Sequence, residues 1–126
     1  MRRPRTAGMS EEVLVPSARD VRGTLDSPDA DRCVVACPPP PRMGGSRSDR
    51  LLRAVSDAVD RACLRFDYGA WDEGRGELAD ARDALAWARE RYDEAALFGY
   101  SFGGCLALVA AARERMPIPP LCVPRT

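Results

Sequence analysis

The sequence predicts an α/β fold. A mostly parallel sheet of about five strands, preceded by an antiparallel hairpin, lies between layers of helices in a three-layer sandwich. The main observation is that apolar, strand-like runs alternate with helical stretches through the last two thirds of the chain, which is the pattern of parallel βαβ units with right-handed crossovers. The second observation is size, because 126 residues, 45% of them apolar, suffice for one domain with a buried core.

The chain begins with three predicted strands. Residues 12–16 and 22–26 form the hairpin, with a turn at 17–20. Residues 33–37 read Cys-Val-Val-Ala-Cys, an apolar run bounded by charge and by proline. Such a run is typical of a strand that is buried on both faces of a sheet. Residues 1–8 are expected to be a disordered extension ahead of the domain.

A proline-rich loop separates the third strand from the first predicted helix. The four prolines at 38–41 exclude the interior of a helix or strand. Ser46 or Ser48 is expected to cap the helix that follows, and the next strand, at 63–67, comes after an unusually short connection. The apolar stripe of this helix consists of Leu51, Val55, Ala58 and Ala62.

The clearest predicted helix covers residues 77–92, after a glycine-rich loop at 68–76. Asp80 is expected on its polar face, and Glu77 and Asp80 are both expected to stabilise the positive N-terminal end of the helix. The apolar face repeats at intervals of three and four residues and consists of Leu78, Ala81, Leu85, Ala88 and Tyr92.

The last predicted elements are a strand at 95–98 and an apolar helix that extends to about Arg113. We place the domain at 9–115 and assign 116–126 to a proline-rich tail, which cannot pair as a central strand. The strand at 95–98 is therefore expected to form an apolar edge of the sheet that needs to be covered.

Composition excludes several classes of function. The 19 basic residues, all of them arginine, balance 19 acidic ones, so no strong field attracts nucleic acid or a membrane, and we expect neither as a partner. The chain contains no lysine and no histidine. This excludes a P-loop lysine, a Schiff base and a Ser–Lys dyad, and it removes the usual general base and the usual zinc ligand. We expect no cofactor and no metal.

The cysteines and the N-terminus indicate the compartment. Five cysteines are present, an odd number, and none forms a Cys-x-x-Cys motif. We expect buried thiols in a reducing environment rather than disulfides. The N-terminus is basic but lacks the apolar stretch of a signal peptide, so a cytoplasmic location is expected.

The strongest catalytic signal is the G-x-S-x-G pattern of Gly99, Ser101 and Gly103. It stands between a predicted strand and a predicted helix, which is the context of a nucleophile elbow. In that sharp turn, small flanking residues let the serine hydroxyl rise from the sheet, and the Phe102 N–H faces a developing oxyanion. The alternative is a glycine-rich strand–helix turn whose serine has no chemical role.

With these motifs the chain resembles the α/β-hydrolase family, in particular its small bacterial and archaeal members related to dienelactone hydrolases and short esterases. The resemblance covers about residues 13–113, the first half of the family's fold. It implies that Ser101 is the nucleophile and that the substrate is a small ester, lactone or thioester. It also implies an oxyanion hole made by the N–H of Phe102 and one from Arg42 or Met43. The matching segments are 40–46, 66–69 and 74–77, the residues Asp80 and Trp87, and the elbow with its glycines Gly99, Gly103 and Gly104.

The chain departs from the family in its proton-transfer groups. The family places an acid and a histidine after later strands, whereas only 25 residues follow Ser101 and none is histidine. We therefore expect a chain that is incomplete and poorly active as written, through truncation or a frameshift near Met116, or one completed by another chain. A carboxylate could replace the base, and the candidates are Asp67, Asp72, Glu73 and Glu77.

Two further residues are candidates for the substrate pocket, each with a structural alternative. Asp67 could line the pocket or only form a turn, and Trp71 could line it or only cover the sheet edge. Two alternatives to a hydrolase stay open. One is a non-catalytic pseudoenzyme or interaction protein that forms a homodimer through the edge at 95–98. The other is a nucleotide-binding βαβ module, against which the absence of G-x-G-x-x-G and of lysine argues.

Overall fold

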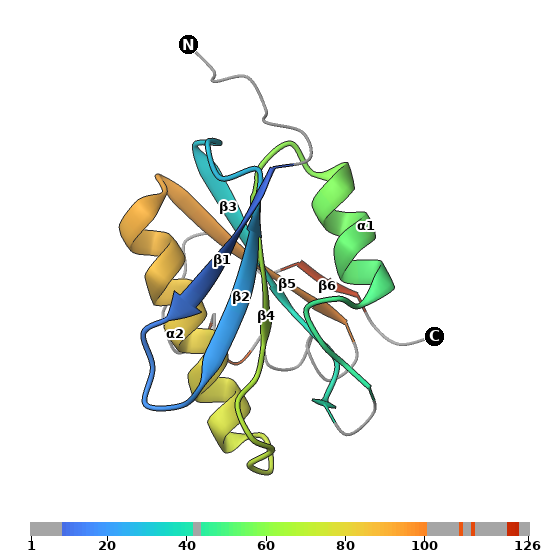
Figure 1. The fold of residues 1–126 in the computed structure, drawn as a ribbon, viewed down its shortest axis with the longest axis vertical. Coiled ribbons are helices and arrows are strands. Elements are labelled where there is room, and N and C mark those ends of the chain that lie inside the picture. Colours follow the sequence, from blue (N-terminus) through green and yellow to red (C-terminus); the bar gives the residue numbers. More distant parts are fainter. Residues whose placement is uncertain (1–8, 42–43, 101–108, 110–111, 113–120, 124–126) are drawn as a thin grey trace.

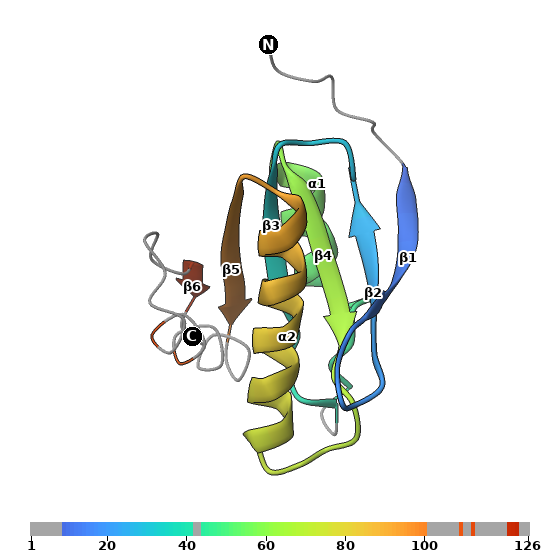
Figure 2. The same ribbon diagram turned by 90° about the vertical axis from the view of Figure 1, so that its left-hand side faces the viewer.

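The computed structural model describes residues 9–41, 44–100, 109, 112 and 121–123. Their strands form one six-stranded sheet in the order β1-β2-β4-β3-β5-β6. Helices α1 and α2 cover opposite faces of this sheet (Figures 1 and 2). The elements are β1 (Ser10–Val15), β2 (Val21–Asp26), β3 (Arg32–Cys37), α1 (Arg50–Ala58), β4 (Ala62–Asp67), α2 (Arg75–Arg91), β5 (Glu94–Tyr100) and β6 (Leu121–Val123).

The sheet is mixed, with its antiparallel strands on one side. β1 pairs with β2, and β2 with β4, in antiparallel orientation. β3 lies parallel between β4 and β5, and β6 is parallel to β5 on the other side. The predicted α/β sandwich, with a leading hairpin and a mostly parallel sheet, is confirmed. The sheet has six strands where the sequence predicted about five.

The additional strand, β6, corrects our expectation for the edge of the sheet. We expected the strand at 95–98 to form that edge, but residues 98–100 of β5 pair with β6. In the sequence β6 fits between Pro120 and Pro124, so prolines flank the strand and do not interrupt it. Its outermost position is one where proline neighbours are tolerated.

The start of α1 also differs from the prediction. The carboxylate of Asp49 accepts hydrogen bonds from the N–H groups of Leu51 at 3.0 Å and Leu52 at 3.2 Å, so Asp49 is the N-cap. The prediction that Ser46 or Ser48 caps this helix is wrong. The Ser46 hydroxyl instead accepts the Ser48 N–H at 3.1 Å and so stabilises the turn before the helix.

The end of α1 comes earlier than predicted. The helix stops at Ala58 because Val59 adopts an extended conformation, with φ −82° and ψ 140°. Ala62, which we placed on the apolar stripe of the helix, is instead the first residue of β4 and is buried. A β-branched residue such as Val59 favours extended backbone, so the chain leaves the helix here without a glycine.

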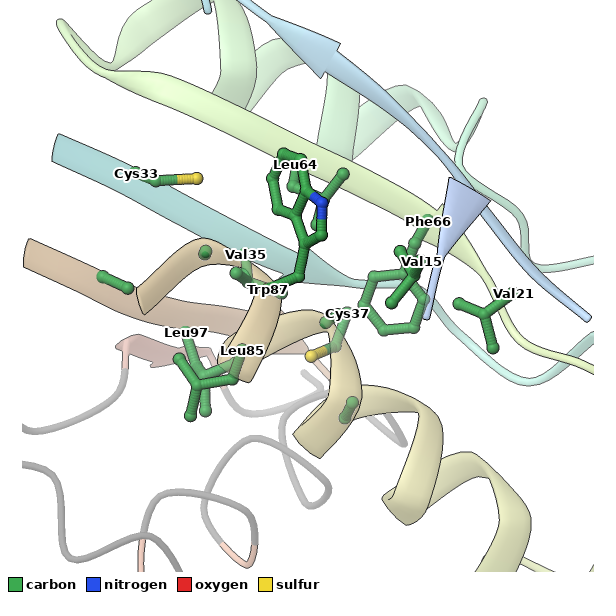
Figure 3. Packing of buried hydrophobic residues seen from close by; sticks show 14 of the residues in the cluster. Val15, Val21, Cys33, Val35, Cys37, Leu64, Phe66, Leu85, Trp87 and Leu97 are labelled. Carbon is green, nitrogen blue, oxygen red and sulfur yellow. The ribbon is translucent and has the colours of Figure 1, made fainter. Parts of the chain in front are cut away.

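The apolar core lies on both faces of β3. Cys33, Val35 and Cys37 belong to a large cluster beneath α2, which Figure 3 shows. Val34 and Ala36 belong to a smaller cluster on the side of α1. All five are at most 1% exposed. The prediction that this strand is buried on both faces is confirmed.

Candidate active site

The carboxyl ends of three parallel strands meet at one edge of the sheet. β3 and β5 end together, because Cys37 at the end of β3 is paired with Gly99 in β5. On the other side of β3, β4 runs parallel to it and ends at Asp67. In open α/β sheets, ligands bind at this edge.

The predicted nucleophile follows this edge directly in the sequence. β5 ends at Tyr100, and Gly99 is a buried strand residue paired with Cys37 on one side and Cys122 on the other. The strand that a nucleophile elbow requires is therefore present, and it ends at the residue before the serine. The roles of the remaining elbow residues stay predictions, since these lie outside the described residues: Ser101, Phe102, Gly103 and Gly104.

The proline-rich loop follows β3 at the same edge. Two backbone hydrogen bonds close it: the Gly44 N–H donates to the Pro41 carbonyl at 2.9 Å, and the Gly45 N–H donates to the Pro40 carbonyl at 3.1 Å. In the sequence these bonds bracket the two residues predicted to supply the second oxyanion donor. Those two residues lie outside the described residues: Arg42 and Met43.

Glycine is favoured at Gly44 and required at Gly45, for different reasons. Gly44 has a φ of +81°, in the left-handed region that side chains disfavour. A Cβ at Gly45 would lie 2.0 Å from the carbonyl oxygen of Pro39, which is backbone and cannot move aside. The loop therefore folds back on its own prolines more closely than any residue larger than glycine allows.

Tyr68 joins this loop to the loop after β4. Its hydroxyl donates to the carbonyl of Pro38 at 2.8 Å, and its ring lies edge-on to Phe66 with the centroids 5.2 Å apart. Burial raises the pKa of Tyr68 well above its ordinary value of 10.0. The hydroxyl therefore keeps its proton and remains a donor to Pro38.

The two predicted pocket residues follow Phe66 along the chain. Asp67 accepts the Arg47 N–H at 2.7 Å through Oδ1, and its Oδ2 lies 3.4 Å from the Arg47 Nε. Arg47 lies in the turn that leads into α1, so Asp67 is bonded to the far end of the proline-rich loop. Its side chain is 40% exposed. Trp71 is half-buried in the loop after β4.

A buried ionic cluster, which sequence reasoning missed, holds the loop after β4. Arg19 lies in the turn between β1 and β2, and its Nε contacts both carboxylate oxygens of Asp80, at 2.9 and 3.1 Å. Its Nη2 lies 3.4 Å from Glu77 Oε2 and also donates to the Ala70 carbonyl. Glu77 and Asp80 are both 0% exposed. We call Arg19, Glu77 and Asp80 the Arg19 cluster.

The two carboxylates of the Arg19 cluster also accept backbone N–H groups of the loop. Asp80 Oδ2 accepts the Gly69 N–H at 2.9 Å. Glu77 accepts the N–H groups of Asp72 and Gly74, each at 2.8 Å, on its two different oxygens. The path of the loop between β4 and α2 is therefore fixed by these two side chains.

Two glycines make room for the Arg19 guanidinium. A Cβ at Gly76 would lie 2.3 Å from Arg19 Nη1, and one at Gly69 would lie 3.1 Å from Arg19 Nε. Both glycines belong to the segment that the arginine holds, so loop and side chain fit each other closely. A larger residue at Gly76 would force the Arg19 side chain and the loop to move apart.

Burial and pairing act in opposite directions on the cluster's pKa values. Burial raises the pKa of Asp80, and although hydrogen bonds from Arg19 and the Gly69 N–H lower it, the net result is a raised pKa. Burial lowers the pKa of Arg19, but the hydrogen bond and the charge of Asp80, together with the charge of Glu77, raise it overall. Arg19 therefore stays charged wherever the protein is folded.

The Arg19 cluster corrects two of our expectations. Asp80 was expected on the polar face of its helix, but it is buried, because the buried stripe of α2 extends back through Glu77 and Asp80. Glu77, one of the candidate bases, is fully buried and bonded through both oxygens, so it supports the loop. The sequence does carry a signal for both acids. Glu77 lies four residues before Ala81 of the apolar face, and Asp80 lies next to Ala81 and five residues before Leu85. Both fall on the buried side of the helix.

The described residues hold no candidate metal centre. Among them, no group of three His, Cys, Asp or Glu side chains is placed to hold a metal ion. Cys33, Cys37 and Cys63 are buried free thiols, as predicted for these three. Within the same part of the chain, neither helix is long and apolar enough to cross a membrane.

Comparison with known proteins identifies the fold. No protein-family model matches the sequence, and neither does any curated protein. The structure is similar to a lidless α/β serine hydrolase from Xanthomonas campestris, with a TM-score of 0.77 and 23% identity over 97% of this chain and 63% of that one. It is also similar to an α/β serine hydrolase homologue from Coxiella burnetii, with a TM-score of 0.73 and 21% identity over 83% of this chain and 58% of that one.

A third similar structure is a hyperthermophilic esterase from the archaeon Pyrobaculum calidifontis, with a TM-score of 0.74 and 24% identity over 88% of this chain and 40% of that chain. At these identities the likeness concerns the fold, and the fold is that of the α/β hydrolases. The chain spans about three fifths of the length of the two serine hydrolases, at 63% and 58%.

Proposed function

We propose that this chain, which has the α/β-hydrolase fold, carries the nucleophile of a serine hydrolase acting on small esters, lactones or thioesters. One observation above all supports this. β5 ends beside the end of β3. The G-x-S-x-G sequence and the proline-rich loop therefore follow two neighbouring parallel strands at one edge of the sheet. A nucleophile and its oxyanion loop need this adjacency.

In the proposed reaction the Ser101 hydroxyl attacks the carbonyl carbon of the substrate. Its proton passes to a base, and the oxyanion is stabilised by the N–H of Phe102 and by one from Arg42 or Met43. The leaving group takes up the proton, and water then hydrolyses the acyl-serine. Both N–H donors are backbone groups. In the proposed reaction, the positions of the proline-rich loop and of the turn after β5 therefore determine how well the transition state is bound.

The base decides how fast this chain reacts. The sequence contains no histidine, and in a serine hydrolase loss of the base costs roughly 10⁶ in kcat. An oxyanion hole and binding alone leave roughly 10³ over water. With Glu77 occupied in the Arg19 cluster, the remaining candidate bases are Asp67 at the end of β4 and Asp72 and Glu73 in the loop after it. We therefore propose slow acylation of Ser101 by the chain on its own.

A fluorophosphonate probe tests this proposal, because it reacts covalently with an activated serine. We expect the folded chain to be labelled and Ser101→Ala to abolish the labelling. Ser48→Ala is the matched control, since Ser48 is an exposed serine that precedes α1 and should leave labelling unchanged. Circular dichroism of each variant verifies that it is folded.

The opposite result has a clear meaning. If Ser101→Ala is labelled as strongly as the parent, Ser101 is not the nucleophile, and if the folded chain is not labelled at all, the chain on its own is not catalytic. The chain would then be a non-catalytic protein with the fold of a hydrolase. A homodimer through the edge of β5 would in that case have to displace β6, which is paired with that strand.

A further inference from the structure

We infer that Tyr68 is a positioning residue for the oxyanion hole. This inference rests on the proposed function, because it takes Arg42 or Met43 as an oxyanion donor. Tyr68 holds the carbonyl of Pro38, the first residue after β3, at 2.8 Å. The loop that begins there leads through the prolines to Arg42 and Met43, so Tyr68 fixes the point from which the loop departs.

The far end of the same loop is held by the neighbouring residue. Asp67 accepts the Arg47 N–H at 2.7 Å. Two consecutive residues at the end of β4, Asp67 and Tyr68, therefore bind both ends of the segment between Pro38 and Arg47. The bonds of Gly44 and Gly45 to the prolines close the middle of this segment. These bonds hold the described residues on either side of the two predicted donors, 38–41 and 44–47, and a held loop of this kind is what preorganisation of an oxyanion hole requires.

Tyr68 is itself held on both sides along the chain. Its ring lies against Phe66 in the core, 7% exposed. The next residue, Gly69, donates its N–H to Asp80, and Asp80 is bound by Arg19. The Arg19 cluster thus reaches the proline-rich loop through Gly69 and Tyr68. On this inference, the buried cluster has a role in positioning the loop.

The chain offers a matched control at the opposite end of the sheet. Tyr92 precedes β5, and its hydroxyl donates to the carbonyl of Pro28, which precedes β3, at 2.9 Å. Tyr92→Phe and Tyr68→Phe therefore remove the same kind of bond, from a tyrosine hydroxyl to a proline carbonyl. Only Tyr68 lies at the edge where the strands of the proposed site end.

The first test measures fluorophosphonate labelling as a function of probe concentration, normalised to folded protein. We expect Tyr68→Phe to lower the maximal labelling rate, kinact, roughly tenfold while leaving the half-saturating concentration, KI, unchanged, because a misplaced oxyanion donor weakens the transition state and not probe binding. Tyr92→Phe should leave both constants unchanged. A role of Tyr68 in stability alone would lower the fraction of folded protein without changing kinact.

The second test does not depend on activity. Residue-resolved amide hydrogen exchange should show faster exchange of the Gly44 and Gly45 N–H groups in Tyr68→Phe than in the parent or in Tyr92→Phe. If Tyr68→Phe does not fold, Arg19→Lys replaces it, since lysine keeps the charge but holds Asp80, and through it Gly69, less firmly. We then expect a smaller fall in kinact at constant KI.

The outcomes separate the two proposals. If the parent chain is not labelled at all, the proposed function fails, and this inference falls with it. If the parent is labelled and the folded variant at Tyr68 or Arg19 reacts at the parental rate, Ser101 remains the nucleophile and only the positioning role is overturned. Unchanged exchange of Gly44 and Gly45 in Tyr68→Phe also overturns it.

Discussion

Arg19 Nε lies 2.9 Å from Asp80 Oδ1, although 61 residues separate the two in the sequence. The contact joins the leading hairpin to the N-terminal part of α2, and the Asp80 side chain is 0% exposed while that of Arg19 is 22% exposed. A buried ion pair is weak evidence for net stability, because desolvation offsets the attraction. Removing one partner is nevertheless costly, because it leaves the other charge buried alone.

The first prediction follows from the high cost of leaving a buried charge without its partner. Arg19→Met should lower the free energy of unfolding by about 3 kcal/mol, because Asp80 and Glu77 lose their common cation. Urea denaturation measures this loss. Arg22→Met is the control from the start of β2, since its ion pair with Asp20 is 66% and 70% exposed, and it should cost no more than about 0.5 kcal/mol. Equal losses in the two variants would contradict the assignment.

The second prediction concerns the two glycines, Gly44 and Gly45, of the proline-rich loop after β3. Gly45→Ala should destabilise the protein by about 2 kcal/mol, because the new Cβ meets the backbone of Pro39 and has to push the loop open. Gly44→Asn should cost under about 1 kcal/mol, because asparagine tolerates positive φ and nothing lies within 4 Å of a Cβ there. Thermal unfolding of both variants tests this order, and a reversed order would show that the loop is not closed as described.

The third prediction depends on a second ionic contact, between Asp26 and Arg65. Arg65 donates to the two carboxylate oxygens of Asp26 at 2.7 and 3.1 Å, and the hydroxyls of Ser10 and Ser56 donate at 2.6 and 2.5 Å. Burial raises the pKa of Asp26, but these hydrogen bonds and the charge of Arg65 outweigh it, so the pKa lies below its ordinary value of 3.8.

A lowered pKa in the folded state has a definite sign for stability. The contribution of Asp26 is present above pH 3.8, its ordinary value, and is lost as the pH falls through the lower folded value. Asp26→Asn should therefore cost about 3 kcal/mol at pH 7, and the difference from the parent should shrink below pH 3.8. Urea denaturation at a series of pH values tests this. A difference that stays constant down to pH 2 would argue against the ionic contact.

The fourth prediction tests the start of α1. Asp49→Ala should cost about 1 kcal/mol, because the N–H groups of Leu51 and Leu52 lose their acceptor. Ser48→Ala should cost much less, because Asp49 and not Ser48 caps the helix. Thermal melts compare the two variants directly. A larger loss for Ser48→Ala would restore the serine as the cap.

The sequence alone predicted the elements whose pattern is strong. The unbroken apolar run of β3 predicted a strand buried on both faces, and the spacing from Leu78 to Tyr92 predicted α2 within two residues at its start and one at its end. These features depend on local periodicity, which a sequence displays directly.

The remaining features depend on contacts between distant segments. The pairing of β6 with β5 depends on where the chain returns after twenty residues, and three residues between prolines give no periodic signal. The burial of Asp80 depends on an arginine 61 positions away. Hydropathy places an aspartate in solvent unless its partner is known, so a buried ion pair is the kind of feature that sequence patterns misplace.

The buried thiols of the sheet contribute to the stability of the fold in a way that depends on pH. Burial raises the pKa of Cys37 and of Cys63 from 9.0 to about 12. Since the folded values lie above the unfolded one, these thiols stabilise the fold fully below pH 9 and progressively less as the pH rises toward 12. The guanidinium groups of Arg19 and Arg65 keep their charge over that range, because their pKa values are raised from 12.5. Ionisation of the thiols is therefore expected to lower the free energy of unfolding at a pH where both arginines still carry their charge.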